Sequence, residues 1–143
     1  MYNKVRKFEE WDRPRAEQIH KDNGLDPRCF PNLMVRTPAG KETENPLFIS
    51  KYVLEVDGMT AMMCFLKVTS EIYLLLDHEI GTPEERWQWL REISEHMKHE
   101  ATIHGLEQIT AFVPTDIEES FAKRLKDLGY EKSPWQSYTL NLE

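Results

Sequence analysis

The stretch that decides the fold runs from residue 71 to residue 130. It reads EIYLLLDH at 71–78, TPEERWQWLREISEHMKHEATIHG at 82–105, EQITAFVP at 107–114 and TDIEESFAKRLKDLGY at 115–130. Short apolar segments alternate with segments of helical periodicity, which predicts strand, helix, strand, helix. Two strands joined by a crossover helix form a βαβ unit, so we expect Glu71–Asp77 and Gln108–Val113 to be parallel neighbours.

The two helices of this stretch carry start and stop signals. In the long helix, Thr82 and Glu85 form a capping box with Pro83 at the first helical position, and Gly105 is a stop signal. Thr115 and Glu118 predict the cap of the last helix, which ends at Gly129. Each helix also has one apolar stripe, which we expect to face the core. The stripes comprise Trp89, Ile93, Met97 and Ala101 in the long helix, and Ile117, Phe121, Leu125 and Leu128 in the last.

Before this stretch the sequence predicts strands, one short helix and a proline-rich irregular segment. A first strand is predicted near Asn3–Phe8, and a helix is predicted from Asp12 to about His20. Prolines make Leu25–Pro46 irregular. Two strands then meet at an Asp-Gly turn at 57–58, and the second, Met59–Thr69, is apolar on both faces. That pattern is typical of a central strand, with Cys64 as a small core residue.

Bulk properties narrow the functional class. The chain has 143 residues, which suits a single domain spanning 1–143. A net charge of −7 with no basic stripe argues against nucleic-acid binding through phosphates. The apolar runs are too short to span a membrane and the N-terminus lacks a signal peptide, so a cytoplasmic protein is expected. The cysteines and histidines show no metal-ligand spacing, so no metal site is predicted.

The order of elements resembles the GNAT (N-acetyltransferase) superfamily over nearly the whole chain. The tail carries the closest likeness: a strand ending in Val113-Pro114, a helix ending in Leu128-Gly129-Tyr130, and an alternating final strand at Ser137–Leu142. The resemblance implies an α/β (α+β) fold, with a mixed, mostly antiparallel sheet flanked by about four helices. It also implies acyl transfer from acetyl-CoA to an amine, on a small molecule or a protein.

In that family a loop of the type P-x-x-R/Q-x-x-G-x-G/A binds the cofactor pyrophosphate before the long helix. One register places Pro83 and Arg86 on the family's proline and arginine, but Trp89 and Arg91 on its glycines. Tight pyrophosphate binding needs free backbone N–H groups and close approach. An indole at this position fills the space that the pyrophosphate needs, so the family's pyrophosphate-binding loop is missing or rebuilt in this chain.

A second register anchors the same loop on Gly81, and there Pro83 removes a donor from the last glycine place. Acidic residues near the helix start compete with a bound anion. From the two registers, the candidate cofactor-binding residues are Gly81, Thr82 and Arg86.

Acyl transfer to an amine also needs a base. Glu71 begins the strand before the long helix, and Asp77 and His78 end it, so these three are the candidate catalytic residues. Many family members carry a tyrosine as general acid where this chain has Leu125, and leucine cannot protonate a thiolate. Tyr130 or Tyr138 would have to substitute.

Two functions therefore stay open. One is a diverged acetyltransferase with a rebuilt cofactor loop. The other is a non-catalytic GNAT-fold structural or partner-binding protein, which binds another protein or forms a homo-oligomer through exposed aromatics such as Trp87. Some small virus-encoded structural proteins are degenerate members of this fold, so a virus-related role is one form of the second reading.

Overall fold

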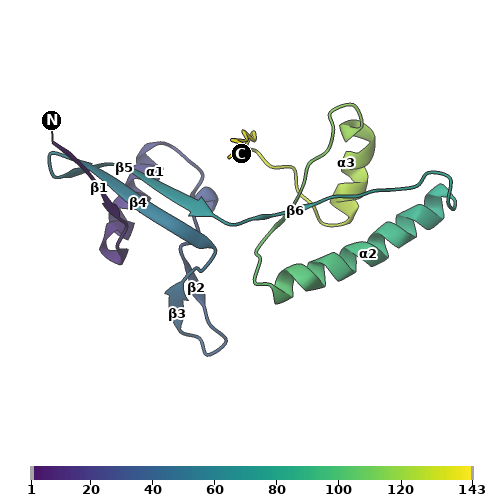
Figure 1. Cartoon of the computed structure of the whole chain (residues 1–143), viewed down its shortest axis with the longest axis horizontal. Coiled ribbons are helices and arrows are strands. Elements are labelled where there is room, and N and C mark those ends of the chain that lie inside the picture. The colour runs from purple at the N-terminus through teal and green to yellow at the C-terminus, as the bar shows by residue number, and fades with distance from the viewer. Residues whose placement is uncertain (1, 143) are drawn as a thin grey trace. The chain divides into compact units, whose positions relative to one another are not determined.

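The computed structural model describes residues 2–142. The chain divides into two compact units, Met1–Thr69 and Ser70–Glu143, so the expectation of one domain remains a prediction. Figure 1 shows a mixed α/β protein. The described residues form three α-helices, whereas the resemblance implied about four.

The first unit is built on a three-stranded antiparallel sheet with the strand order β1-β4-β5. Asp57 and Gly58 both have positive φ (50° and 81°), as a tight hairpin turn between β4 and β5 requires, so the predicted hairpin is confirmed. The strands are β1 (Asn3–Lys7), β4 (Phe48–Val56) and β5 (Met59–Lys67).

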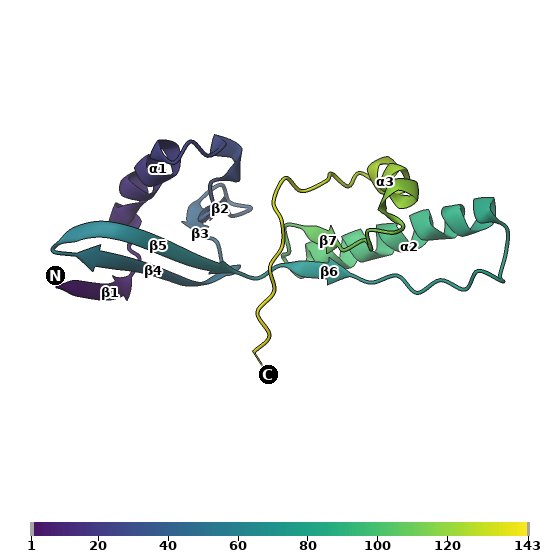
Figure 2. The same ribbon diagram turned by 90° about the horizontal axis from the view of Figure 1, so that it is seen from above.

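One helix, α1 (Arg13–Asp22), covers one face of this sheet, as Figure 2 shows. It follows a short 3-10 turn, η1 (Glu10–Asp12), and Pro14 in its first turn lacks only an N–H that has no helical partner anyway. The core lies between helix and sheet. It consists of Phe8, Ala16, Leu33 and Val53, with Phe30, Phe48, Met63 and Phe65 packed against it.

The segment after α1 contains more structure than the prolines indicated. It forms a second 3-10 turn, η2 (Pro27–Cys29), and a small antiparallel hairpin of β2 (Met34–Arg36) with β3 (Glu42–Glu44). Leu33 brings this segment into the core.

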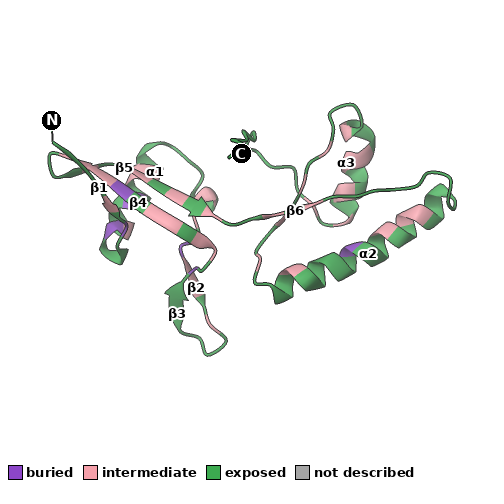
Figure 3. Cartoon of the chain, in the orientation of Figure 1, coloured by how far each residue is buried: buried purple, intermediate pink, exposed green. Residues whose placement is uncertain are grey.

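The sheet face opposite α1 carries exposed apolar side chains, among them Tyr52, Met62 and Leu66. Figure 3 shows that most of β4 and β5 is intermediate or exposed. Cross-strand neighbours on this face include Tyr52 beside Cys64 and Leu54 beside Met62. The expectation that Met59–Thr69 is central is wrong within this unit, because among the described residues β5 pairs with β4 alone and forms an edge. Cys64 lies opposite Tyr52 on the face away from α1, so it is exposed rather than in the core.

The second unit contains the predicted βαβ connection. Strands β6 (Ser70–Ile72) and β7 (Ile109–Ala111) are parallel and are joined by α2 (Pro83–Ile103). The predicted pairing is confirmed, but both strands are shorter than predicted. The ladder ends at Ile72 and Ala111, and Tyr73 and Leu75 beyond it are exposed.

The predicted last helix forms as α3 (Glu118–Asp127), but it begins after Ile117 without a side-chain cap, so the predicted cap at Thr115 is wrong. The final strand does not form. Tyr138, Leu140 and Leu142 are 92%, 82% and 91% exposed. An alternating sequence becomes a strand only when another strand accepts its backbone hydrogen bonds, and none does so in the described part of this unit.

The apolar stripe of α2 is also less buried than its spacing predicted. Trp89 is 43% exposed and Ile93 is 52% exposed, so these side chains are not core residues. Helical spacing identifies a shared face but does not show what covers it. Among residues 2–142, no helix is long and apolar enough to cross a membrane.

Candidate functional site

The start of α2 is the junction where the resemblance places the cofactor. The Thr82 hydroxyl accepts a hydrogen bond from the Glu85 N–H at 3.2 Å, and the Glu85 carboxylate accepts one from the Thr82 N–H at 3.1 Å. The predicted capping box is therefore confirmed. Because Pro83 has no N–H, the helix start offers an external anion few donors.

Arg86 is bonded to the turn that precedes the helix. Its Nη1 donates to the backbone carbonyl oxygens of Gly81 at 2.6 Å, His78 at 3.2 Å and Ile80 at 3.3 Å. These bonds hold the guanidinium against the chain's own backbone. The one basic residue that matches the family motif thus stabilises the turn, and a phosphate would have to compete for it.

Trp89 fills the space beside Gly81. Gly81 has φ +75°, and a β-carbon built on it would lie 2.5 Å from Cη2 and 2.7 Å from Cζ3 of the indole. Only glycine fits here, both because of this φ and because of the ring. In a phosphate-binding turn, such a glycine lets the ligand approach the backbone closely. Here the indole of Trp89 occupies the space beside the glycine.

The candidate cofactor residues are therefore close together but bonded to one another. Gly81, Thr82 and Arg86 belong to one closed turn, and Glu84 and Glu85 add negative charge to the first helical turn. Negative side chains favour a helix N-terminus just as a phosphate does. The sequence thus provides its own anionic cap at this position.

The three candidate catalytic residues are not joined by any hydrogen bond or ion pair among the described residues. Glu71, on β6, accepts a hydrogen bond from the Tyr73 hydroxyl, which raises the pKa of that phenol. Asp77 accepts one from the Glu79 N–H at 2.9 Å. The expectation that Asp77 and His78 end the strand is wrong, because β6 stops at Ile72 and both residues lie in the exposed turn before α2.

Glu71 does line a shallow pocket within the second unit. The pocket has a volume of about 220 Å³ and lies between the β6–β7 pair and the end of α2. Glu100 and His104 are its other ionisable residues, and the His104 ring also contacts the Glu100 carbonyl oxygen at 2.8 Å. All three side chains are exposed, and neither Asp77 nor His78 lines this pocket.

The two tyrosines considered as general acids in place of Leu125 differ in their exposure to solvent. Tyr130 is partly buried, and burial raises the pKa of its phenol. Tyr138 is almost fully exposed. Leu125 lies on α3, as its place in the apolar stripe predicted. Residues 2–142 contain no group of three or more side chains that could hold a metal ion.

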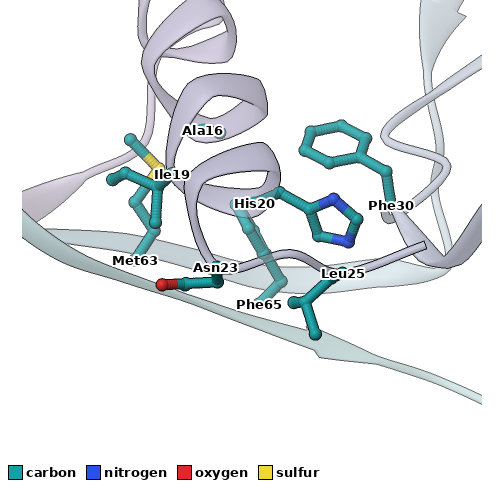
Figure 4. A pocket seen from close by; sticks show the side chains of 8 residues that line it. All are labelled: Ala16, Ile19, His20, Asn23, Leu25, Phe30, Met63 and Phe65. Carbon is teal, nitrogen blue, oxygen red and sulfur yellow. The ribbon is translucent and has the colours of Figure 1, made fainter. Parts of the chain in front are cut away.

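A second pocket, in the first unit, was not predicted from the sequence. It has a volume of about 150 Å³, and we call it the His20 pocket (Figure 4). Its lining residues are Ala16, Ile19, His20, Asn23, Leu25, Phe30, Met63 and Phe65. Ala16, Ile19 and His20 share one face of α1 at helical spacing, which is the sequence signal that could have identified it.

No protein-family model, no curated protein and no solved structure matches this chain.

Proposed function

We propose that this chain is a non-catalytic protein of GNAT-like plan, with a closed cofactor turn, that assembles with a second copy of itself. The single observation that carries the proposal is the packing of Trp89 against Gly81 at the start of α2. The βαβ connection of β6, α2 and β7 supports the GNAT-like plan, since the resemblance implies it. The single mixed sheet that the resemblance also implies is not formed among the described residues, where β5 and β6 belong to different sheets.

Binding acetyl-CoA at this turn would require several changes at once. The indole would have to leave Gly81, and Arg86 would have to release three carbonyl oxygens. Each lost hydrogen bond costs about 0.5–1.5 kcal/mol. The acidic first turn opposes the incoming charge as well. The turn is thus more stable without the cofactor than a phosphate-binding loop would be.

The second copy is inferred from the edge of the first unit's sheet. Strand β5 is nine residues long, has no proline, and has no charged residue before Lys67. Its one irregularity is a register shift near its start, where Ala61 is the extra residue opposite Leu54 and Glu55. Its backbone has no strand partner on the side away from β4 in the described residues. Proteins normally guard such an edge with charges, prolines or bulges, because it pairs readily with another strand.

An identical β5 strand is a suitable occupant of this edge. Two copies can pair antiparallel about a twofold axis, since the same strand then supplies both sets of donors and acceptors. This pairing would also bring the exposed apolar faces with Met62, Cys64 and Leu66 together into one larger face. A self-complementary edge beside an apolar face favours a homodimer over an unrelated partner.

Sedimentation of the full chain tests the assembly. We expect the wild type to be a dimer at micromolar concentration, and Met62→Lys to shift it toward monomer because a charge enters the apolar face. Ile103→Lys is the matched control, since Ile103 is similarly exposed (62% against 58%) but lies on α2. A monomeric wild type, or a control that dissociates equally, would overturn the self-assembly proposal.

The diverged acetyltransferase remains the rival proposal. It needs acetyl-CoA as cofactor and an amine acceptor, with Glu71, Asp77 and His78 as candidate catalytic residues. Calorimetric titration with acetyl-CoA separates the two readings, and it does so independently of the oligomeric state.

A further inference from the structure

The His20 pocket has the size and lining of a site for a small ring. An engineered apolar cavity of about 150 Å³ lined by Leu, Ile and Phe binds benzene. The His20 pocket has about the same volume but is open to solvent on one side, and its wall includes two aromatic rings and a thioether, from Phe30, Phe65 and Met63. A methionine sulfur also makes favourable contacts with the edge of an aromatic ring.

One polar atom in the wall lacks a partner. The Nε2 atom of His20 is buried and has no hydrogen-bond partner among the described residues. The imidazole is held edge-on against Phe30, with ring centroids 5.4 Å apart. A buried polar atom without a partner destabilises the protein. Two effects therefore favour binding of a ligand that bonds to it: burial of the ligand's apolar surface and the new hydrogen bond.

The chemistry of the imidazole indicates which group would meet it. A neutral ring nitrogen donates in one tautomer and accepts in the other, and a hydroxyl group can do both. A charged group is disfavoured because the other side chains around the cavity, apart from Asn23 at its rim, are apolar. The site therefore suits a neutral ring with one hydroxyl.

We propose that the His20 pocket binds a small, uncharged aromatic molecule that carries one hydroxyl group, of the phenol class. In this proposal the ring lies among Phe30, Met63 and Phe65, and the imidazole turns about its Cβ–Cγ bond, because its buried Nε2 must move to meet the hydroxyl. This site uses no residue of α2 and only the inner face of β5, so it goes beyond the proposed function.

Titration of the ¹⁵N-labelled full chain with phenol, followed by NMR, tests the site. Toluene serves as the matched probe that lacks the hydroxyl. We expect saturable shifts at Ile19, Phe30 and Phe65, with a dissociation constant of about 1 mM for phenol. Toluene should bind about fivefold more weakly, as the loss of one hydrogen bond predicts.

Two variants locate the interaction. His20→Phe should retain binding of both probes and lose the preference for phenol. Leu25→Trp should weaken both, because Leu25 is partly exposed and a larger ring there obstructs the pocket. Absence of saturable shifts in the folded wild type would overturn the site. Equal binding of phenol and toluene, or a preference that survives His20→Phe, would overturn the role of His20.

Discussion

Asp12 and Arg6 form the most buried ion pair described in the first unit. Asp12 is 2% exposed, and its two carboxylate oxygens accept from Arg6 at 2.7 and 2.8 Å. Arg6 also pairs with Glu55 on β4, and Asp12 additionally accepts from the Glu9 N–H at 2.8 Å. The cluster therefore ties β1, η1 and β4 together.

Removing the charge of Asp12 should destabilise this unit strongly. Asp12→Asn leaves Arg6 with one carboxylate partner instead of two, and weakening a hydrogen bond to a charged group costs about 1.5–3 kcal/mol. Urea unfolding measures this loss. Asp22→Asn is the control, since Asp22 is exposed at the end of α1, and it should change stability by less than about 1 kcal/mol. Equal losses of stability in Asp12→Asn and Asp22→Asn would contradict the role assigned to the ion pairs of Arg6.

The same cluster predicts how the stability of the unit depends on pH. The Arg6 hydrogen bonds lower the pKa of Asp12 from its ordinary value of 3.8. A carboxylate whose pKa is lower in the folded state stabilises the fold above pH 3.8, and that stability is lost as the pH falls through the lowered pKa.

Asp26 acts in the same direction, since Arg28 lowers its pKa to about 2, but it is exposed and contributes little. Acid titration of the melting temperature should therefore show a decline below pH 3.8 that is much smaller in Asp12→Asn. Identical acid profiles of wild type and variant would contradict this assignment.

Residue identity alone predicted part of the α2 junction. The capping box, the missing N–H at Pro83 and an indole in a glycine place are all readable from the sequence. The direction of the Arg86 side chain is not, because a guanidinium can bond equally well to a phosphate or to carbonyl oxygens. The same holds for Arg6 and Glu55, which are far apart in the sequence and meet only when β1 pairs with β4.

At the level of elements, the start of α2 should stabilise the helix measurably. Thr82→Ala removes the N-cap bond to Glu85, and such a loss costs about 1 kcal/mol. Thr102→Ala is the matched control, because Thr102 only bonds back to the Lys98 carbonyl oxygen within the helix. Thermal unfolding should show a loss for the first variant and little change for the second. A larger loss of stability in Thr102→Ala than in Thr82→Ala would contradict the cap assignment.

Helices were more predictable than strands, and the reason is physical. The helices α1, α2 and α3 satisfy their backbone hydrogen bonds locally, so periodicity indicates that they exist. Their exact starts are less predictable, because only α2 has the predicted side-chain cap. A strand depends on a partner that is distant in sequence. Met59–Thr69 has the composition of a central strand, yet β5 is an edge within its unit, and Ser137–Leu142 alternates without any partner.

At the scale of the whole molecule, both units carry exposed apolar surface that a monomer normally hides. Met62 and Leu66 on β5, and Trp89 and Ile93 on α2, are each more than 40% exposed. Apolar surface of this extent typically marks an interaction site. This exposed surface supports the proposed self-assembly, and the closed turn at the start of α2 supports the proposed loss of cofactor binding.

Calorimetric titration of the full chain with acetyl-CoA tests the central claim most directly. The closed turn predicts a dissociation constant no tighter than about 1 mM, because Trp89 and Arg86 would both have to be displaced. Trp89→Ala is the informative variant, since it opens the space beside Gly81 and should bind at least as well as the wild type. A micromolar affinity of the wild type would contradict the non-catalytic assignment and restore the acetyltransferase.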